Sequence, residues 1–240
     1  MKKIVLLTTL LCFGVMFAWS QKPANVQIPL IGDQAITFTG ESTNGPINFP
    51  DDFGRKWKIL FSHPKDFTPV CSSELLELAS LQADFKSLNT AIVVVSTDNL
   101  EQHKTWKESL ETVKYNGKGP QKIDFPLVAD ENKVISSEYG MIHANSSTTK
   151  DVRGVFIINP DNKIAAIFFY PSTVGRNMDE IKRTLIALQT TKDNVVLPAN
   201  WQPGKDVILS YLTPEEQAQI GKPNSDIYQV AWYMTFMKMK

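Results

Sequence analysis

The chain has 240 residues, of which 42% are hydrophobic, 10% aromatic and 21% charged. This is the composition of a globular protein with room for one ordinary domain and a smaller one. Its 25 lysines and arginines balance its 25 aspartates and glutamates, so the formal net charge is zero. A neutral chain lacks the basic footprint of nucleic-acid-binding proteins, and we therefore exclude nucleic acid as the main partner.

The first 20 residues predict a secretory signal peptide. Two lysines follow the initiator methionine, residues 4–18 form a mostly apolar run that is short for a membrane span, and small residues precede Gln21. We expect cleavage before Gln21 and an exported protein, periplasmic or extracellular, with no stable membrane span after cleavage. The alternative is an uncleaved signal that anchors the protein in a membrane. The bulky leucine before Cys12 argues against a lipid anchor on that cysteine.

Cleavage would leave a single thiol in the mature protein. The sequence has two cysteines, and Cys12 lies in the signal, so only Cys71 would remain. In a compartment that favours disulfides, a lone thiol is either packed and inert or reactive. The inert case is the more common one across proteins, because free cysteine is among the most buried residues. The surroundings of Cys71 must therefore decide between the two.

The region around Cys71 changes from a strand pattern to a helix pattern. Residues 21–50 are polar and predict an irregular segment with one or two short strands, and residues 57–62 predict a buried strand. A turn is expected at 66–70, and an amphipathic helix from Cys71 onwards. The apolar residues that recur every three or four positions in this helix are Leu75, Leu78, Leu81, Phe85 and Leu88.

The remaining elements alternate between strand and helix. In order, they are a β-branched strand at 91–96, a helix at 99–113, a short strand at 125–129, a short helix at 132–139, a hairpin of strands at 154–159 and 163–170, and a helix at 177–188. Asp98 is placed to cap the helix at 99–113. This alternation predicts an α/β fold with a sheet covered on both faces. Residues 192–240, which are rich in proline and hold two tryptophans, predict a smaller domain packed on the first or on a partner subunit.

Cys71 falls where a strand-ending loop meets the start of a helix. Spare backbone N–H groups and the positive end of the helix dipole favour a thiolate there. An ordinary thiol, with a pKa of about 8.5, is only a few per cent ionised at pH 7, and making it mostly thiolate takes about 3.4 kcal/mol. A helix dipole contributes at most about 2 kcal/mol. If Cys71 is a nucleophile, an arginine or lysine from elsewhere in the chain must supply the rest.

Thr68 stands three residues before Cys71, in the spacing of a C-x-x-C redox motif whose first cysteine is replaced by threonine. A dithiol–disulfide cycle inside the mature protein is therefore excluded. A hydroxyl at this place can still donate a hydrogen bond to a substrate oxygen. Pro64 and Pro69 fix the loop and remove backbone donors, which helps to shield a thiolate from water.

These residues carry a family resemblance. The run P-K-D-F-T-P-V-C matches the P-x-x-x-T-x-x-C active-site signature of the peroxiredoxins at Pro64, Thr68 and Cys71, and the longer run over residues 61–75 resembles the 1-Cys subgroup. Two further segments also resemble that subgroup, at residues 151–164 and 170–181.

The resemblance runs from about Val26 to the C-terminus and implies a fold. It implies a thioredoxin-like domain, in which helices flank a central mixed sheet, over residues 26–191. It implies a C-terminal dimerisation domain over residues 192–240, and hence a homodimer.

The resemblance also implies the other site residues. Arg153, on the strand V-R-G-V-F, corresponds to the family's arginine that stabilises the thiolate and the peroxide. Arg176 corresponds to a second arginine, Glu74 to the glutamate that orients the arginines, and His63 to the histidine beside the active site in the 1-Cys subgroup. The alternatives are that Arg176 and Glu74 belong to surface ion pairs and that His63 is a structural histidine.

The implied activity is that of a thiol-dependent peroxidase for hydrogen peroxide and organic hydroperoxides. The Cys71 thiolate attacks one peroxide oxygen while Thr68 and Arg153 hold the peroxide, water or an alcohol departs, and Cys71 becomes a sulfenic acid. Because no resolving cysteine remains, an external thiol of unknown identity must complete the cycle.

No cofactor, metal or haem is expected. The three histidines, His63, His103 and His143, are too scattered along the sequence to suggest a metal site by their spacing.

Three other functions remain open. Some 1-Cys peroxiredoxins hydrolyse phospholipids through a serine, a histidine and an aspartate, but here Lys56 and Pro50 stand at the serine and histidine positions and only Asp161 survives, so we predict no such activity. The protein could instead act as a chaperone or as a redox sensor that passes its oxidation to a partner. Finally, Cys71 could be a plain structural cysteine.

Overall fold

The computed structural model of the protein describes residues 28–239. The predicted signal peptide and Cys12 lie outside the described residues. Among the residues that are described, no helix combines the length and the apolar character that a membrane crossing requires.

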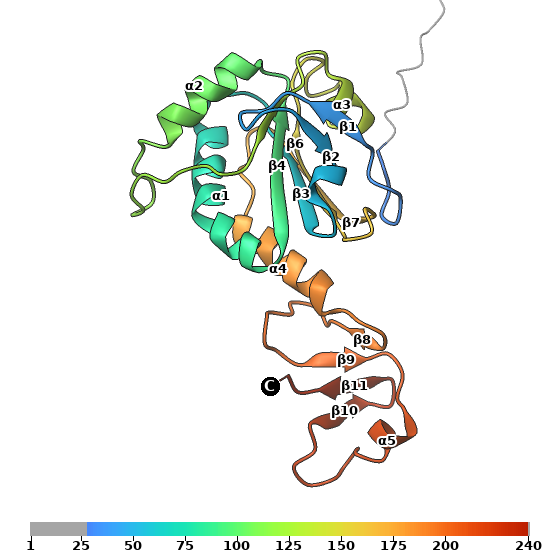
Figure 1. Ribbon diagram of the computed structural model, residues 1–240. Helices are drawn as coiled ribbons and strands as arrows, with labels where there is room; N and C mark the ends of the chain where they lie inside the picture. Colours follow the sequence, from blue (N-terminus) through green and yellow to red (C-terminus); the bar gives the residue numbers. More distant parts are fainter. Residues whose placement is uncertain (1–27, 240) are drawn as a thin grey trace, which may run out of the picture.

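A five-stranded mixed sheet forms the centre of the larger part of the molecule (Figure 1). Its strand order is β5 (Leu127–Ala129), β4 (Thr90–Ser96), β3 (Trp57–Ser62), β6 (Arg153–Ile158) and β7 (Ile164–Tyr170). The first three strands of this order are parallel, whereas β6 runs antiparallel to both β3 and β7. The predicted central mixed sheet is therefore confirmed.

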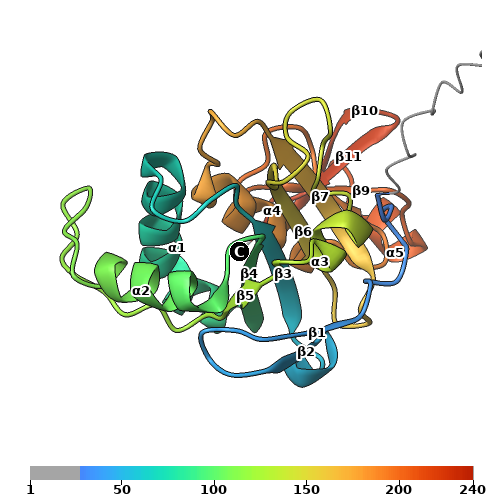
Figure 2. The same cartoon turned by 90° about the horizontal axis from the view of Figure 1, so that it is seen from above.

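Both faces of the sheet are covered, because successive side chains of a strand point to opposite faces. Ile59 and Phe61 of β3 pack in the core under the helices α1 (Pro69–Ser87), α2 (Leu100–Leu110) and α4 (Met178–Thr190). Leu60 packs in a second core under the hairpin of β1 (Phe38–Gly40) and β2 (Ile47–Phe49) and under α3 (Val134–Glu138). Figure 2 shows α1 and α2 on one side of β3 and β4, with α3 on the other. A short 3₁₀ helix, η1 (Asp51–Phe53), follows β2.

The first helix begins two residues earlier than predicted. It starts at Pro69, because proline has the backbone angle of a first helical turn and lacks an N–H that would have no partner there. Cys71 consequently lies inside the first turn of α1.

The prediction that Asp98 caps the second helix is wrong. Asn99 is the N-cap of α2, and its side chain accepts a hydrogen bond of 2.8 Å from the backbone N–H of Gln102. Asp98 instead accepts one of 2.8 Å from the backbone N–H of Asp66. The Asp98 side chain thus ties the loop before α1 to the start of α2.

The predicted hairpin of β6 and β7 is confirmed, with Asn162 in the left-handed conformation at its turn (φ 61°). The short strand β5 begins two residues later than predicted, and α4 continues to Thr190.

A second sheet lies beyond α4 and is separate from the first (Figure 1). It contains β8 (Val195–Val196), β9 (Val207–Leu209), β10 (Ile227–Ala231) and β11 (Met234–Met237) in the order β10-β11-β9-β8, with the short helix α5 (Pro214–Gln217) between β9 and β10. All its pairings are antiparallel. The domain boundary after residue 191 stays a prediction.

Candidate active site

The Cys71 thiol lies in the first turn of α1, with no solvent exposure. Thr68 is the N-cap of this helix in backbone conformation. Spare N–H groups and the positive end of the helix dipole therefore lie near the sulfur, as the sequence predicts. Cys71 forms no disulfide within the described residues.

Arg153 supplies the cation that the sequence argument requires. Its Nη1 lies 3.3 Å from Cys71 Sγ and 2.7 Å from Glu74 Oε2. Its Nη2 donates to the carbonyl of Ser172 at 2.6 Å, and its Nε donates to the same oxygen at 3.1 Å. The guanidinium is thus held on both sides, by α1 and by the loop after β7, with one N–H directed at the sulfur.

Glu74 and Arg176 form the support behind Arg153. Arg176 donates to both carboxylate oxygens of Glu74, from Nε at 2.9 Å and from Nη2 at 2.7 Å, and its backbone N–H donates to Oε1 at 2.7 Å. Its Nη1 donates to the carbonyl oxygens of Ser62 and Gly154, at 2.8 and 2.7 Å. One guanidinium therefore ties α1 to the ends of β3 and β6.

These charges are buried, so the alternative of plain surface ion pairs is wrong. The side chains of Glu74, Arg153 and Arg176 are 2%, 2% and 1% exposed. Burial by itself raises the pKa of Glu74, but the charge and hydrogen bonds of Arg176, and then the charge of Arg153, outweigh it and hold that pKa below its ordinary value. Glu74 stays ionised and balances part of the charge of the two arginines.

Thr68 and Pro64 lie in the loop before α1 without a hydrogen bond to the sulfur. The Thr68 hydroxyl donates to the carbonyl of Lys65 at 2.8 Å and does not cap the helix. The residue before it, Phe67, has its backbone in the left-handed conformation (φ 54°), and its side chain is half exposed. This conformation is costly for an aromatic residue and is the kind of local strain that clusters at functional sites.

His63 does not stand alone: the histidines are scattered along the sequence, but the fold brings two of them, His63 and His103, to the same carboxylate. His63 Nε2 lies 2.7 Å from one carboxylate oxygen of Asp66, and His103 Nδ1 lies 2.7 Å from the other. The two rings are 5.9 Å apart, and all three side chains are fully buried. His143 lies elsewhere, against Phe169.

Several residues of the site were not singled out by the sequence. Asp66 lies within the signature, but its variable position gave no reason to choose it, and His103 is 37 residues further along the chain. The Ser62 hydroxyl donates to the carbonyl of Val152 at 2.7 Å and accepts from the N–H of Gly154 at 2.8 Å. It thereby fixes the end of β3 against the strand that carries Arg153.

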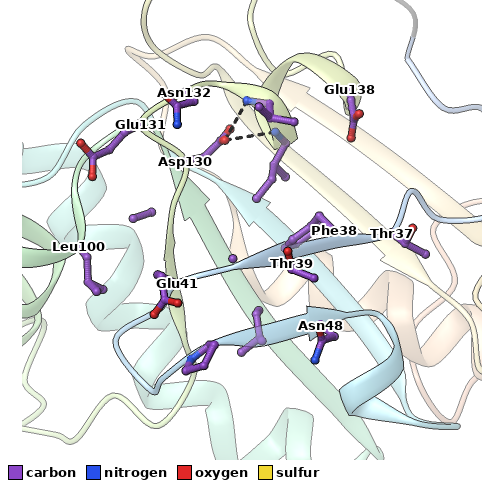
Figure 3. Close-up of a pocket in the computed structure, with 16 residues that line it drawn as sticks. Thr37, Phe38, Thr39, Glu41, Asn48, Leu100, Asp130, Glu131, Asn132 and Glu138 are labelled. Atoms are coloured by element: carbon purple, nitrogen blue, oxygen red, sulfur yellow. Dashed lines mark hydrogen bonds between the residues drawn. The ribbon is translucent and has the colours of Figure 1, made fainter.

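An open groove among the described residues lies away from Cys71. It measures about 780 Å³ and runs between the β1–β2 hairpin and α3, with the side chains of Glu41, Glu131 and Glu138 along it (Figure 3). Asp130 also lines it, but both its oxygens accept hydrogen bonds from the first backbone N–H groups of α3. None of the seven predicted site residues lines this groove.

Fold and site together define a thioredoxin-like protein with one buried, arginine-contacting cysteine at a helix start. The family pattern of AhpC/TSA matches residues 31–167, and that of the C-terminal domain of 1-Cys peroxiredoxin matches residues 187–220. The chain belongs to the peroxiredoxin family, and its C-terminal part places it with the 1-Cys type.

Similar proteins agree with this assignment. A peroxiredoxin of Methanosarcina mazei is 44% identical over 88% of this chain and 98% of its own length. A mutant of peroxiredoxin 6 from Arenicola marina matches with a TM-score of 0.76 and 34% identity, over 88% of this chain and 98% of that one. A yeast mitochondrial 1-Cys peroxiredoxin matches with a TM-score of 0.76 and 37% identity, over 88% of this chain and all of that one. The protein is a thiol-dependent peroxidase, and Cys71 is the single cysteine among its described residues.

Proposed function

We propose that Cys71 is the peroxidatic cysteine and that Arg153 is its main partner. The thiolate attacks the nearer oxygen of a peroxide, the S–O bond forms as the O–O bond breaks, and the departing oxygen leaves as water or an alcohol after taking up a proton. Cys71 is oxidised to the sulfenic acid and the peroxide is reduced. Two equivalents of an external thiol then return Cys71 to the thiol, with release of a disulfide and water.

The contact of 3.3 Å between Arg153 Nη1 and Cys71 Sγ carries this proposal. A buried cation beside the sulfur stabilises the thiolate, and its N–H groups are in place for the negative charge that develops on the departing oxygen. Glu74 and Arg176 hold the guanidinium in position. Thr68 contributes a hydroxyl to the peroxide, Pro64 shapes the loop, and His63 lies between β3 and that loop.

Stopped-flow oxidation of the reduced protein by hydrogen peroxide tests the proposal, with mass spectrometry of Cys71. Fast formation of sulfenic acid that Cys71→Ser abolishes is expected. Arg153→Lys keeps the charge but loses the fixed fork of donors, so we expect a rate lower by roughly 10²-fold. Arg55→Lys is the matched control, because Arg55 is exposed and its ion pair among the described residues is with Asp161. Oxidation of Cys71 no faster than that of a free thiol would refute the proposal and favour a structural cysteine.

The reductant is proposed to be a small or protein thiol. The yeast relative is described as resolved through glutathione and thioredoxin systems. Turnover should therefore appear with glutathione or with thioredoxin and its reductase. Fast oxidation of Cys71 without turnover by either would favour the sensor instead.

The assembly is proposed to be a homodimer that uses the C-terminal sheet. Large apolar side chains are exposed on this part of the chain, and they are Val196, Tyr211, Val230, Trp232, Tyr233 and Met239. A set of this kind is typical of a covered surface.

Export is proposed from the sequence of the first 20 residues. Mass spectrometry of the mature protein should find Gln21 at its N-terminus. Detection of residues 1–20 on the mature protein would favour the membrane-anchored alternative.

A further inference from the structure

A buried chain of three side chains runs beside the first turn of α1. His63 directly follows β3, Asp66 lies in the loop before α1, and His103 belongs to α2. Asp66 uses one carboxylate oxygen for His63 Nε2 and the other for His103 Nδ1, both at 2.7 Å. Each of the three side chains is fully buried. A buried polar cluster of this kind is costly unless every group in it is paired.

The acceptors around His103 determine where its protons lie. Its Nε2 is 3.2 Å from the carbonyl oxygen of Val128, which can only accept, so this nitrogen carries a proton. Burial raises the pKa of Asp66, but the hydrogen bonds from His103 and then from His63 outweigh it and hold that pKa below its ordinary value. Nδ1 of His103 therefore faces an ionised carboxylate and carries a proton as well. His103 is thus placed to donate from both ring nitrogens, to the Asp66 carboxylate and to the Val128 carbonyl oxygen.

The same carboxylate fixes the tautomer of His63. Nε2 donates to Asp66, and Nδ1 has no hydrogen-bond partner among the described residues. Burial lowers the pKa of His63, and the opposing effect of Asp66 is smaller, so the ring is neutral at pH 7 and its Nδ1 is a bare acceptor. The charged groups that act on this ring are Asp66, His103 and, more weakly, Asp98.

The His63 ring is also held next to the first turn of α1, which contains Cys71. It lies 5.1 Å from the ring of Trp106 on α2, and the Trp106 Nε1–H donates to the hydroxyl of Ser72 at 3.2 Å. Ser72 is the neighbour of Cys71. The His63 ring is thus linked, through Trp106, to the same helical turn as the sulfur.

We propose that His103 and Asp66 are positioning residues of the peroxidatic site, which keep His63 neutral and keep its Nδ1 free to accept a proton during thiol turnover. The charge of His103 balances that of Asp66, so that Asp66 orients His63 without stabilising the protonated form of its ring. The inference rests on the proposed function. It concerns one proton in the reduction of the sulfenic acid. The incoming thiol gives up this proton as its sulfur bonds to the sulfur of Cys71, and the departing hydroxide takes it up to form water.

His103→Leu tests the role of this charge. Asp66 would then act on His63 alone, and the midpoint of the His63 titration, followed by NMR of the ring nitrogens, should rise by about one pH unit or more. The rate at which dithiothreitol reduces the Cys71 sulfenic acid should fall by up to about fourfold at pH 7 and recover as the pH is raised past the new midpoint. His143→Leu, outside the cluster, should change neither quantity.

A second pair of variants separates positioning from folding. His103→Asn keeps a donor for Asp66 without the charge and should show the same upward shift of the His63 titration. His103→Leu combined with Asp66→Asn removes the carboxylate that His103 balances, and it should restore a neutral His63 and most of the reduction rate. A purely structural role predicts that the double variant is worse than either single one.

Three results would overturn the inference. The first is an unchanged His63 titration in both His103 variants, and the second is a reduction rate at pH 7 that these variants do not alter. The third is a stoichiometric transition metal in the purified protein, since a metal would then take the place of the protons between His63, Asp66 and His103. Slow oxidation of Cys71 in the wild type would refute the proposed function instead. The His63 titration does not depend on Cys71 oxidation, so the two failures are distinguishable.

Discussion

At the scale of single residues, the site is a set of buried charges that depend on one another. Glu74 lies between Arg153 and Arg176 and bonds to both. A buried charge that loses its partner is far more costly than an exposed one, because water cannot replace the lost interaction. A related cost applies to Asp151, whose buried carboxyl has no hydrogen-bond partner of good geometry among the described residues.

Glu74→Gln should therefore destabilise the protein by about 3–5 kcal/mol, because two buried guanidinium groups lose their carboxylate. Unfolding in urea, followed by fluorescence, measures the change. Glu77→Gln is the matched control, since it lies on the same helix in a partly exposed pair with Lys118 and should cost at most about 1 kcal/mol. Similar costs for the two variants would contradict the account.

Asp151 predicts a pH-dependent stability. Neither of its oxygens has a hydrogen-bond partner of good geometry among the described residues, and burial raises its pKa well above the ordinary value, against a smaller opposing effect of the Ser136 hydroxyl. A carboxyl whose pKa is raised by folding contributes most to the stability of the folded state below its pKa in the unfolded chain, about 3.9. This contribution is lost as the pH rises through its pKa in the folded state.

Asp151→Asn should consequently raise the melting temperature at pH 8, by the equivalent of about 1–3 kcal/mol, and should give a smaller gain at pH 4.5. Calorimetry at the two pH values measures both gains. The exposed Asp124, changed to Asn, serves as control and should show neither. An equal gain at both pH values would show that Asp151 is not the titrating group.

At the scale of elements, the site depends on how closely β3 and β6 approach. Gly154 follows Arg153 on β6, and a Cβ there would lie 3.0 Å from Ser62 Oγ and 3.3 Å from the ring of Phe169. The absence of a side chain at Gly154 thus lets the two strand ends meet where Arg176 bonds to both of their carbonyl oxygens.

Gly154→Ala should force these strands apart and cost about 1–3 kcal/mol of stability. Because the displaced strand carries Arg153, the oxidation of Cys71 by hydrogen peroxide should slow as well. Gly119→Ala, at a site with no atom within 4 Å of the added Cβ, should leave both quantities unchanged. A destabilised Gly154 variant with an unaltered oxidation rate would show that Arg153 tolerates the shift.

At the scale of the whole molecule, the C-terminal sheet carries large apolar side chains that remain exposed. Trp232 and Tyr233, between β10 and β11, are 86% and 67% exposed, and Val230 is 66% exposed. A second copy of the chain is the occupant that we propose for this surface.

Replacing Val230 and Trp232 together by glutamate should weaken the proposed dimer by tenfold or more, a roughly 1.4 kcal/mol effect that apolar anchors at an interface readily exceed. Sedimentation equilibrium measures the dissociation constant. Ile31→Glu, at a residue that is 68% exposed outside the C-terminal sheet, is the control. A dimer as tight as the wild type would place the interface on another face.

The sequence by itself determined the family and the central mixed sheet, and it singled out Cys71 as the candidate reactive cysteine. The period of the apolar residues after Cys71 and the signature around it are local, so they can be recognised without the fold. The need for a cation also followed from the sequence, because a helix start alone stabilises a thiolate too little. The resemblance then pointed to Arg153.

Only the tertiary structure decided which charges meet and what is buried. Arg176 reaches Glu74 across 102 residues, and His103 reaches Asp66 across 37, distances at which sequence spacing carries no information. The cap of α2 was missed for a related reason: Asp98 and Asn99 are both good capping residues, and Asp98 is drawn instead to the backbone of Asp66. Contacts between distant segments arise from how helices pack on the sheet, and that packing assembles the supports of Cys71.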